Sequence, residues 1–129
     1  MKFSTRSEYG LRAIVQLDKA AKKAVSLASI ATKEEISLAY LERLFALLKK
    51  ADLIKADKGV KGGYYLARPA KQISVLQIIE ALEGTVAPFA CVGGKDFSCS
   101  NNCHIHPVWR KLYLRITETL GSIKLNSIM

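Results

Sequence analysis

The sequence lacks any hydrophobic run near the ~18 residues that a membrane-spanning helix needs. Its start, Met1-Lys2-Phe3-Ser4, also lacks the apolar core of a signal peptide. Acidic residues are few, because eleven Asp and Glu stand against twenty Lys and Arg, which leaves a formal charge of +9. These absences favour a cytoplasmic protein that does not enter the membrane and whose partner is a polyanion.

Cysteine and histidine are scarce and unevenly distributed. All three cysteines and both histidines fall in the segment from Cys91 to Pro107. Three thiols cannot all pair within one chain, and the cytoplasm keeps thiols reduced, so disulfides explain them poorly. Cys91, Cys99 and Cys103, followed by His104 and His106, instead provide enough ligands for an iron–sulfur cluster or for zinc. The spacing alone leaves both open.

The periodicity of apolar residues predicts a mainly α-helical domain with one small β-hairpin. A chain of 129 residues, half of them hydrophobic, can bury a core of its own. A short helix, a turn, a longer helix and a basic hairpin follow one another, which is the order of a winged helix-turn-helix. The predicted helices are 4–21, capped by Thr5 and Glu8, then 27–33, a third after Ser37, a fourth from Ser74 with Gln77 to Gly84, and a last one from Pro107; the hairpin strands are 53–57 and 64–67.

The third helix is the predicted recognition helix, because the first residues of the second helix in a helix-turn-helix meet base edges in the major groove. An arginine there can donate two hydrogen bonds to guanine, and a glutamate can accept from the cytosine amine. The competing interpretation is an ordinary solvated helix face, but the element order together with the basic charge favours DNA. The candidate contacts are Ser37, Leu38, Ala39, Tyr40, Glu42 and Arg43, with Lys58 and Lys61 in the wing.

Four parts of the chain together form a specific pattern: the start with Tyr9 and Leu11-Arg12-Ala13, the run 36–42 (ISLAYLE), the wing Gly62-Gly63-Tyr64, and three cysteines before a long helix. In these parts the chain resembles the winged-helix repressors that carry an iron–sulfur cluster, a family of cluster-assembly regulators and nitric-oxide sensors. The resemblance implies a transcriptional repressor that binds a partly palindromic operator as a homodimer. The apolar stripe of the last helix is the expected dimer seam: Leu112, Ile116, Leu120 and Ile123.

The same resemblance implies a ligand set. It places Cys91, Cys99 and Cys103 at the family's three cysteines and His106 at its histidine, and the expected cofactor is a [2Fe–2S] cluster. Glu8, contributed by the other subunit, is the alternative fourth ligand, since some relatives use an acidic residue near that position. The chain departs from the family in its C-x7-C-x3-C spacing, where C-x5-C-x5-C is usual, and in having Lys58 where many relatives have arginine.

We therefore expect one compact unit with three parts: a winged helix-turn-helix DNA-binding domain (1–84), a cluster-binding loop (85–107) and a dimerisation helix (107–129). The predicted function is a DNA-binding repressor whose affinity is controlled by a cluster that senses iron–sulfur, redox or nitric oxide status. The alternative is a zinc-stabilised DNA-binding protein without a sensing role. An enzyme with a small-molecule substrate is disfavoured, because no acid or oxyanion motif accompanies the cysteines and no phosphate-binding loop follows a strand.

Overall fold

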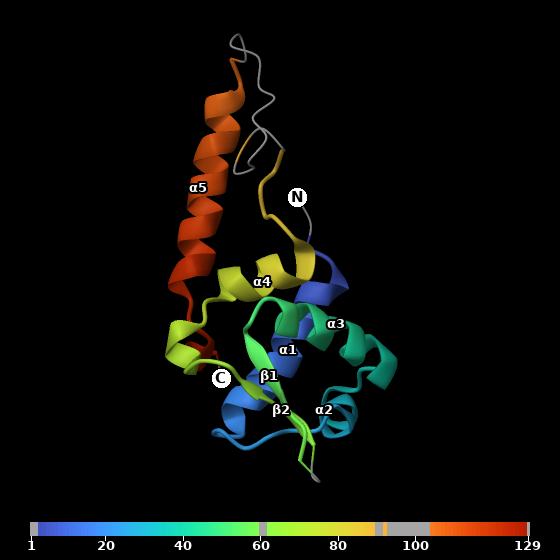
Figure 1. Ribbon diagram of the computed structural model, residues 1–129. Coiled ribbons are helices and arrows are strands. Elements are labelled where there is room, and N and C mark those ends of the chain that lie inside the picture. Colours follow the sequence, from blue (N-terminus) through green and yellow to red (C-terminus); the bar gives the residue numbers. More distant parts are fainter. Residues whose placement is uncertain (1–2, 60–61, 90–91, 93–103, 129) are drawn as a thin grey trace.

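The computed structural model describes residues 3–59, 62–89, 92 and 104–128 and contains a helical body from which one long helix projects (Figure 1). Within these ranges no helix is long and apolar enough to cross a membrane. The elements are α1 (Thr5–Lys19), α2 (Leu27–Glu34), α3 (Leu38–Lys50), β1 (Ile54–Asp57), β2 (Gly63–Leu66), α4 (Val75–Glu83) and α5 (His106–Ser122), with 3₁₀ turns at Ala70–Gln72 and Leu125–Ser127.

Serine side chains begin the first four helices. Ser37 accepts a hydrogen bond from the backbone N–H of Tyr40, and Ser74 forms the predicted capping box with Gln77. The capping box of Thr5 and Glu8 predicted for α1 was wrong: Ser4, not Thr5, is the N-cap. The reason is that Ser4 has the extended backbone an N-cap requires, so its hydroxyl accepts from the Arg6 N–H at 3.1 Å.

The far end of α1 also differs from the prediction. The helix ends at Lys19, and Ala21 lies outside it, exposed and with a φ of 47°. A residue in the left-handed region cannot continue a right-handed helix, so the helix does not extend to Ala21. At the end of α4, in contrast, Gly84 stops the helix as predicted, with a φ of 90° that favours glycine.

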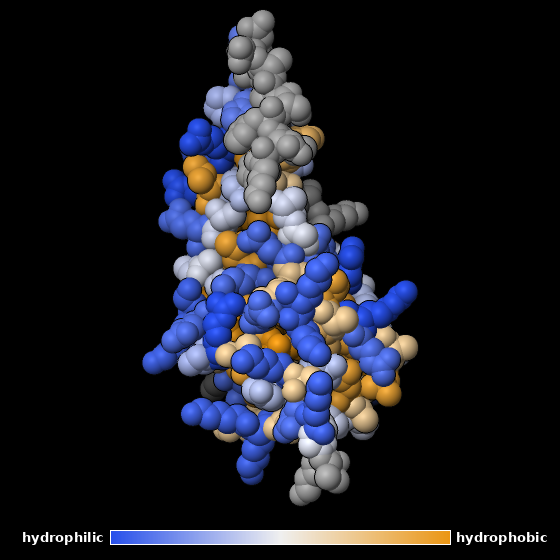
Figure 2. Space-filling view, in the orientation of Figure 1, coloured by the Kyte–Doolittle hydropathy of each residue, from blue (hydrophilic) through white to orange (hydrophobic). Residues whose placement is uncertain are grey.

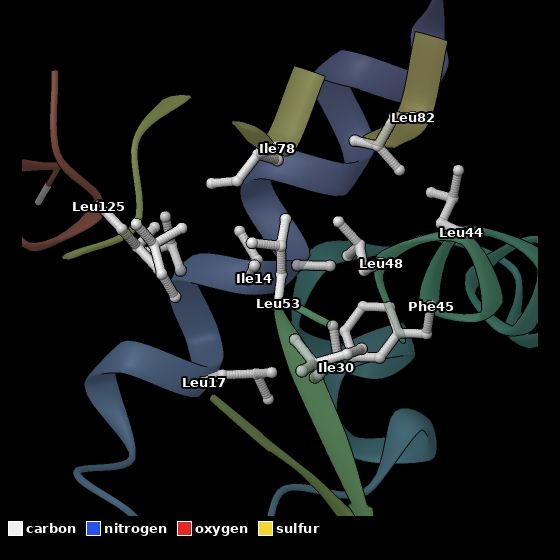
Figure 3. Packing of buried hydrophobic residues seen from close by; sticks show 14 of the residues in the cluster. Ile14, Leu17, Ile30, Leu44, Phe45, Leu48, Leu53, Ile78, Leu82 and Leu125 are labelled. Atoms are coloured by element: carbon white, nitrogen blue, oxygen red, sulfur yellow. The ribbon is translucent and has the colours of Figure 1, made fainter. Parts of the chain in front are cut away.

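The core forms where α1, α2, α3 and α4 meet. Figure 3 shows apolar side chains from these helices packed together, among them Phe45 of α3, which is completely buried. The apolar stripe of α3 repeats at helical spacing, and its four members are all buried: Leu41, Leu44, Phe45 and Leu48. Leu125, which follows α5, is buried in the same core.

The hairpin lies at the end of the body opposite α5 (Figure 1). Its two strands pair antiparallel, from Ile54 opposite Leu66 to Asp57 opposite Gly63. Val25, which lies before α2, also pairs with Tyr64 of β2 as a single-residue antiparallel bridge, through two backbone hydrogen bonds of 2.8 Å. The ring of Tyr64 packs edge-on against Phe45, 5.1 Å between centroids, which ties the hairpin to α3.

The last part of the chain does not stay helical to its end, as the 107–129 boundary required. The helix stops at Ser122, and Ile123 lies beyond it, where its carbonyl accepts from the Val75 N–H at 2.8 Å. The Leu125 N–H then donates to the Ile73 carbonyl at 2.8 Å. These bonds and the burial of Leu125 hold the tail against the start of α4, so the tail belongs to the body and not to the projecting helix.

Candidate nucleic-acid interface

The solvent-facing side of α3 carries the predicted recognition residues. Five of the six are exposed, and Tyr40 is half-buried: Ser37, Leu38, Ala39, Glu42 and Arg43 are the exposed ones. Leu38 is a large apolar residue on this face and is 44% exposed. The opposite side of the helix is fully buried, so the core holds this face rigidly toward solvent.

Tyr40 is held by α1. Its hydroxyl lies 3.1 Å from the Thr5 hydroxyl, and its ring packs edge-on against Tyr9 at 5.9 Å between centroids. These two contacts restrain the tyrosine and connect the first turn of α1 to the first turn of α3. Tyr40 therefore helps to fix α3 relative to α1, in addition to any contact that it makes with a ligand.

A groove of about 870 Å³ runs between these two first turns. Its walls combine the recognition residues with the start of α1, and two arginines, Arg6 and Arg43, contribute to them. The α1 side of this surface, which consists of Ser4, Thr5 and Arg6, was not predicted from the sequence. The sequence signal that could have revealed it is Arg6, a basic residue in the first turn of a helix. A positive charge is unfavourable there because it is repelled by the helix dipole, so its presence suggests a function.

The wing presents Lys58 to solvent directly after β1. The turn around it is built by short-range bonds, because the Asp57 carboxylate accepts from the Gly59 N–H at 2.9 Å and the Gly59 carbonyl from the Gly62 N–H at 2.8 Å. Lys61, the second predicted wing contact, lies outside the described residues. Lys58 and Arg43 thus give basic side chains on both the wing and the recognition helix.

Glu83, the last residue of α4, binds the start of α1. Its carboxylate accepts from the Ser4 N–H at 3.2 Å and from the Ser4 hydroxyl, and it lies 3.8 Å from the Nε of Arg6. Burial would raise the pKa of this carboxyl, but the Ser4 hydrogen bonds and the Arg6 charge outweigh burial and lower it. Glu83 therefore stays ionised at neutral pH beside the groove.

The predicted metal ligands are only partly described. Cys91, Cys99 and Cys103 lie outside the described residues. His106 is the first residue of α5 and is half-buried, whereas Glu8 is exposed on α1 and pairs with Arg12 at 2.9 Å. Among the residues with described positions, no three His, Cys, Asp or Glu side chains lie together as metal ligands would.

The two sides of the cysteine segment approach each other. Phe89, two residues before Cys91, packs against Trp109 of α5 with 4.9 Å between ring centroids. Trp109 lies one helical turn after His106. The aromatic contact thus brings the chain just before the first cysteine to the part of α5 that carries the histidine.

The predicted dimer residues differ in how far their own chain covers them. Leu112 and Ile123 are exposed, whereas Ile116 and Leu120 are half-buried against a small cluster formed by Val75, Ile79 and Val86. No residue of α5 is fully buried. Figure 2 shows orange apolar side chains interrupting the blue surface in the region of this helix. Within the described residues, α4 and Val86 therefore cover Ile116 and Leu120 in part and leave Leu112 and Ile123 exposed.

Comparisons with known proteins agree with this architecture. Residues 3–129 match the Rrf2 family, described as iron-dependent transcriptional regulators. The chain is 36% identical to the HTH-type transcriptional regulator IscR of Vibrio vulnificus, over the whole of this chain and 77% of that protein. Its fold is similar to T. potens IscR, with a TM-score of 0.76, 38% identity and coverage of 98% of this chain and 84% of that one.

A second solved structure is CymR, the global cysteine regulator of B. subtilis. It superimposes with a TM-score of 0.80 at 30% identity, over 98% of this chain and 94% of that one. The matched proteins are transcriptional regulators and not enzymes, and their structures confirm the predicted combination of a helical body and a two-stranded hairpin.

Proposed function

Because the chain belongs to the Rrf2 family of transcriptional regulators, we propose that it is a DNA-binding repressor whose affinity for its operator is controlled by an iron–sulfur cluster. The observation that carries the DNA-binding part is the exposed, rigidly held face of α3. Five of its six predicted residues are exposed, and it borders a groove with an arginine on each side.

On this proposal the first turns of α3 enter the major groove of DNA. Arg43 donates to a guanine edge, Glu42 accepts from a cytosine amine, and the exposed apolar Leu38 and Ala39 contact a thymine methyl group. Ser37 meets a phosphate beside the helix N-terminus, where the dipole favours an anion. Lys58 and Lys61 of the wing contact the DNA phosphate backbone, each as a single point charge without the planar, bidentate geometry of an arginine guanidinium.

The donor set fits an iron–sulfur cluster. Three thiolates and one imidazole make four ligands of the kinds that such clusters use. The contact between Phe89 and Trp109 supports their convergence, because it holds the flank of Cys91 near the turn that begins with His106. When bound, a [2Fe–2S] cluster would supply a redox-active centre, and histidine ligation typically makes such a centre easier to reduce. The chain's own part is to hold it with Cys91, Cys99, Cys103 and His106.

Glu8 is the weaker candidate for the fourth ligand. Its carboxylate already pairs with Arg12 four residues along α1, an arrangement that stabilises an exposed helix face. His106, in contrast, is the first residue of α5 and follows the last cysteine, Cys103, by three residues. Zinc remains the alternative occupant, favoured by the short Cys99–Cys103 spacing, and would make the protein a DNA-binding module without sensing.

We further propose that the protein acts as a homodimer through α5. Leu112, with Leu114 and Val108, leaves apolar surface exposed on the N-terminal half of α5. A two-fold dimer would present two recognition helices to a partly palindromic operator. A cluster bound beside His106, at the N-terminal start of α5, can alter DNA affinity only if it has a different affinity for two arrangements of these helices and so favours one of them.

The test is to purify the protein without oxygen, record its visible absorption, and measure its binding to promoter DNA before and after removal of the cluster. Broad iron–sulfur bands together with a change in DNA affinity on removal are expected. A colourless, zinc-containing protein that binds DNA would establish the zinc alternative. A coloured protein whose DNA affinity is the same with and without the cluster would refute the sensing mechanism.

A further inference from the structure

Arg6 has the position of a DNA contact that the recognition helix does not supply. It lies in the first turn of α1, and its side chain, 52% exposed, lines the groove opposite Arg43. Its Nε is directed toward the helix start, 3.3 Å from the Ser4 hydroxyl and 3.8 Å from Glu83. Within the described residues, its two terminal nitrogens form no hydrogen bond or ion pair. One edge of the guanidinium is thus held, and the other remains available.

An arginine at this point needs an anion beside it. The N-terminus of a helix carries a partial positive charge, which repels a cation in the first turn. The Glu83 carboxylate, only 14% exposed, offsets this repulsion from the last turn of α4. It also accepts from both the backbone and the hydroxyl of Ser4, so its place relative to Arg6 is set by three polar groups.

We infer that Glu83 is a positioning residue for DNA binding: it holds Arg6 at the edge of the groove so that the terminal guanidinium nitrogens bind a backbone phosphate. The inference rests on the proposed DNA-binding function and adds to it a contact from α1. A phosphate is the fitting partner, because a guanidinium with one free edge can donate two parallel hydrogen bonds to its oxygens. The phosphate charge also suits the N-terminal end of α1.

The sign of the effect separates positioning from simple charge. Glu83 is an anion near a polyanion's binding surface, so removing it should strengthen DNA binding if only long-range charge matters. If it positions Arg6, removing it should weaken binding. Glu80→Gln is the matched control. Glu80 lies one turn earlier on α4 and does not contact Ser4 or Arg6, so this substitution removes the same charge without disturbing that contact.

Glu83→Gln separates positioning from helix capping. Glutamine keeps an oxygen that can accept from the Ser4 N–H, so α1 stays capped, but it loses the charge that holds Arg6. The other variants are Arg6→Ala and the double variant Arg6→Ala with Glu83→Gln. Arg12→Ala is the control for losing an arginine of the same helix that lies outside the groove. Thermal unfolding of each variant establishes that it is folded at the assay temperature.

The experiment measures affinity for a labelled duplex of arbitrary sequence, about 30 base pairs long, as a function of salt, because phosphate contacts need no operator. Loss of one phosphate contact lowers the log–log salt slope by about 0.9, so the affinity ratio of wild type to variant shrinks about 3.5-fold from 50 to 200 mM salt. Arg6→Ala and Glu83→Gln should each show this change, the double variant no more than either, and Glu80→Gln and Arg12→Ala none.

Three outcomes would overturn the inference. They are a Glu83→Gln variant that binds as Glu80→Gln does, a loss of affinity with an unchanged salt slope, and effects of Arg6 and Glu83 that add in the double variant. Wild-type binding that ignores salt would instead refute the proposed function itself, so the two failures are distinguishable.

Discussion

Replacing Gly63 by alanine should separate the wing from the rest of the body. A Cβ at this position would lie 2.7 Å from both the carbonyl carbon and the carbonyl oxygen of Val25, and 3.0 Å from its nitrogen. These are backbone atoms, so no side-chain rotation can relieve the overlap. Either β2 or the segment before α2 must move.

The cost follows from what the movement breaks. Overpacking a tight site typically costs about 1–3 kcal/mol. The bridge between Val25 and Tyr64 consists of two backbone hydrogen bonds of 2.8 Å, each worth about 0.5–1.5 kcal/mol. Gly63→Ala should therefore lower the free energy of unfolding by about 2–6 kcal/mol, a large part of the 5–15 kcal/mol typical of a domain.

Gly62→Ala is the matched control. Among the described residues, a Cβ at Gly62 meets only the carbonyl oxygens of Asp57 and Gly59, both at 3.6 Å, which is ordinary contact. The Gly62 N–H that donates to the Gly59 carbonyl is kept in alanine. This variant should change the free energy of unfolding by less than about 0.5 kcal/mol.

Urea unfolding followed by circular dichroism measures both variants against the wild type. The close approach predicts that Gly63→Ala unfolds at lower urea with an unchanged m-value, while Gly62→Ala overlays the wild type. Equal midpoints for the two alanine variants would refute the reasoning, because they would show that the gap beside Val25 opens without cost. Salt-dependent DNA binding should weaken in Gly63→Ala alone, since Lys58 moves with the wing.

The remaining predictions concern the groove, the dimer and the ligands. Arg43→Ala should cost about 1–3 kcal/mol at one base pair and relax sequence preference there, and an equal loss on random DNA would reassign it to phosphate. Leu112→Asp should give monomers by sedimentation with little loss of stability, because this residue is exposed in the single chain; a dimer that persists would count against the α5 seam. Alanine in place of any one cysteine should abolish the cluster and its absorption, while His106→Ala should alter the spectrum and retain some iron; loss of the cluster in Glu8→Ala with an unaltered His106→Ala would move the fourth ligand to α1. Because the pKa of Glu83 is lowered in the folded state, its contribution to stability is complete above the ordinary glutamate value and fades as pH falls below about 4.5, so the wild type and Glu83→Gln should converge in unfolding free energy in acid; a constant difference would contradict this.

Local patterns were sufficient for much of the fold. The caps at Ser37 and Ser74, the stop at Gly84 and the buried stripe of α3 each depend on residues within one or two turns, so the amino-acid order specifies them directly. The element order and the exposed face of α3 followed from the same periodicity. The residues at the start of α3 could therefore be identified as the candidate interface before any contact between helices was known.

Contacts between distant segments decided the rest. Ser4 and Thr5 are both able to cap α1, and the choice falls on Ser4, whose backbone and hydroxyl are bound by Glu83, 79 residues away. The same contact places Arg6 beside the recognition helix. The requirement at Gly63 likewise comes from Val25, which nothing in the wing's own sequence reveals.

The dimer stripe shows the limit most clearly. A periodicity of three and four residues marks Ile116 and Leu120 as apolar and on one face, but it does not say what covers them. The folded chain uses α4 to cover these two in part, leaves Leu112 exposed, and removes Ile123 from the helix altogether. Amino-acid order determines which surfaces must avoid water, whereas only the packing of the whole chain determines which of them are already buried, because burial depends on neighbours that lie far away in the sequence.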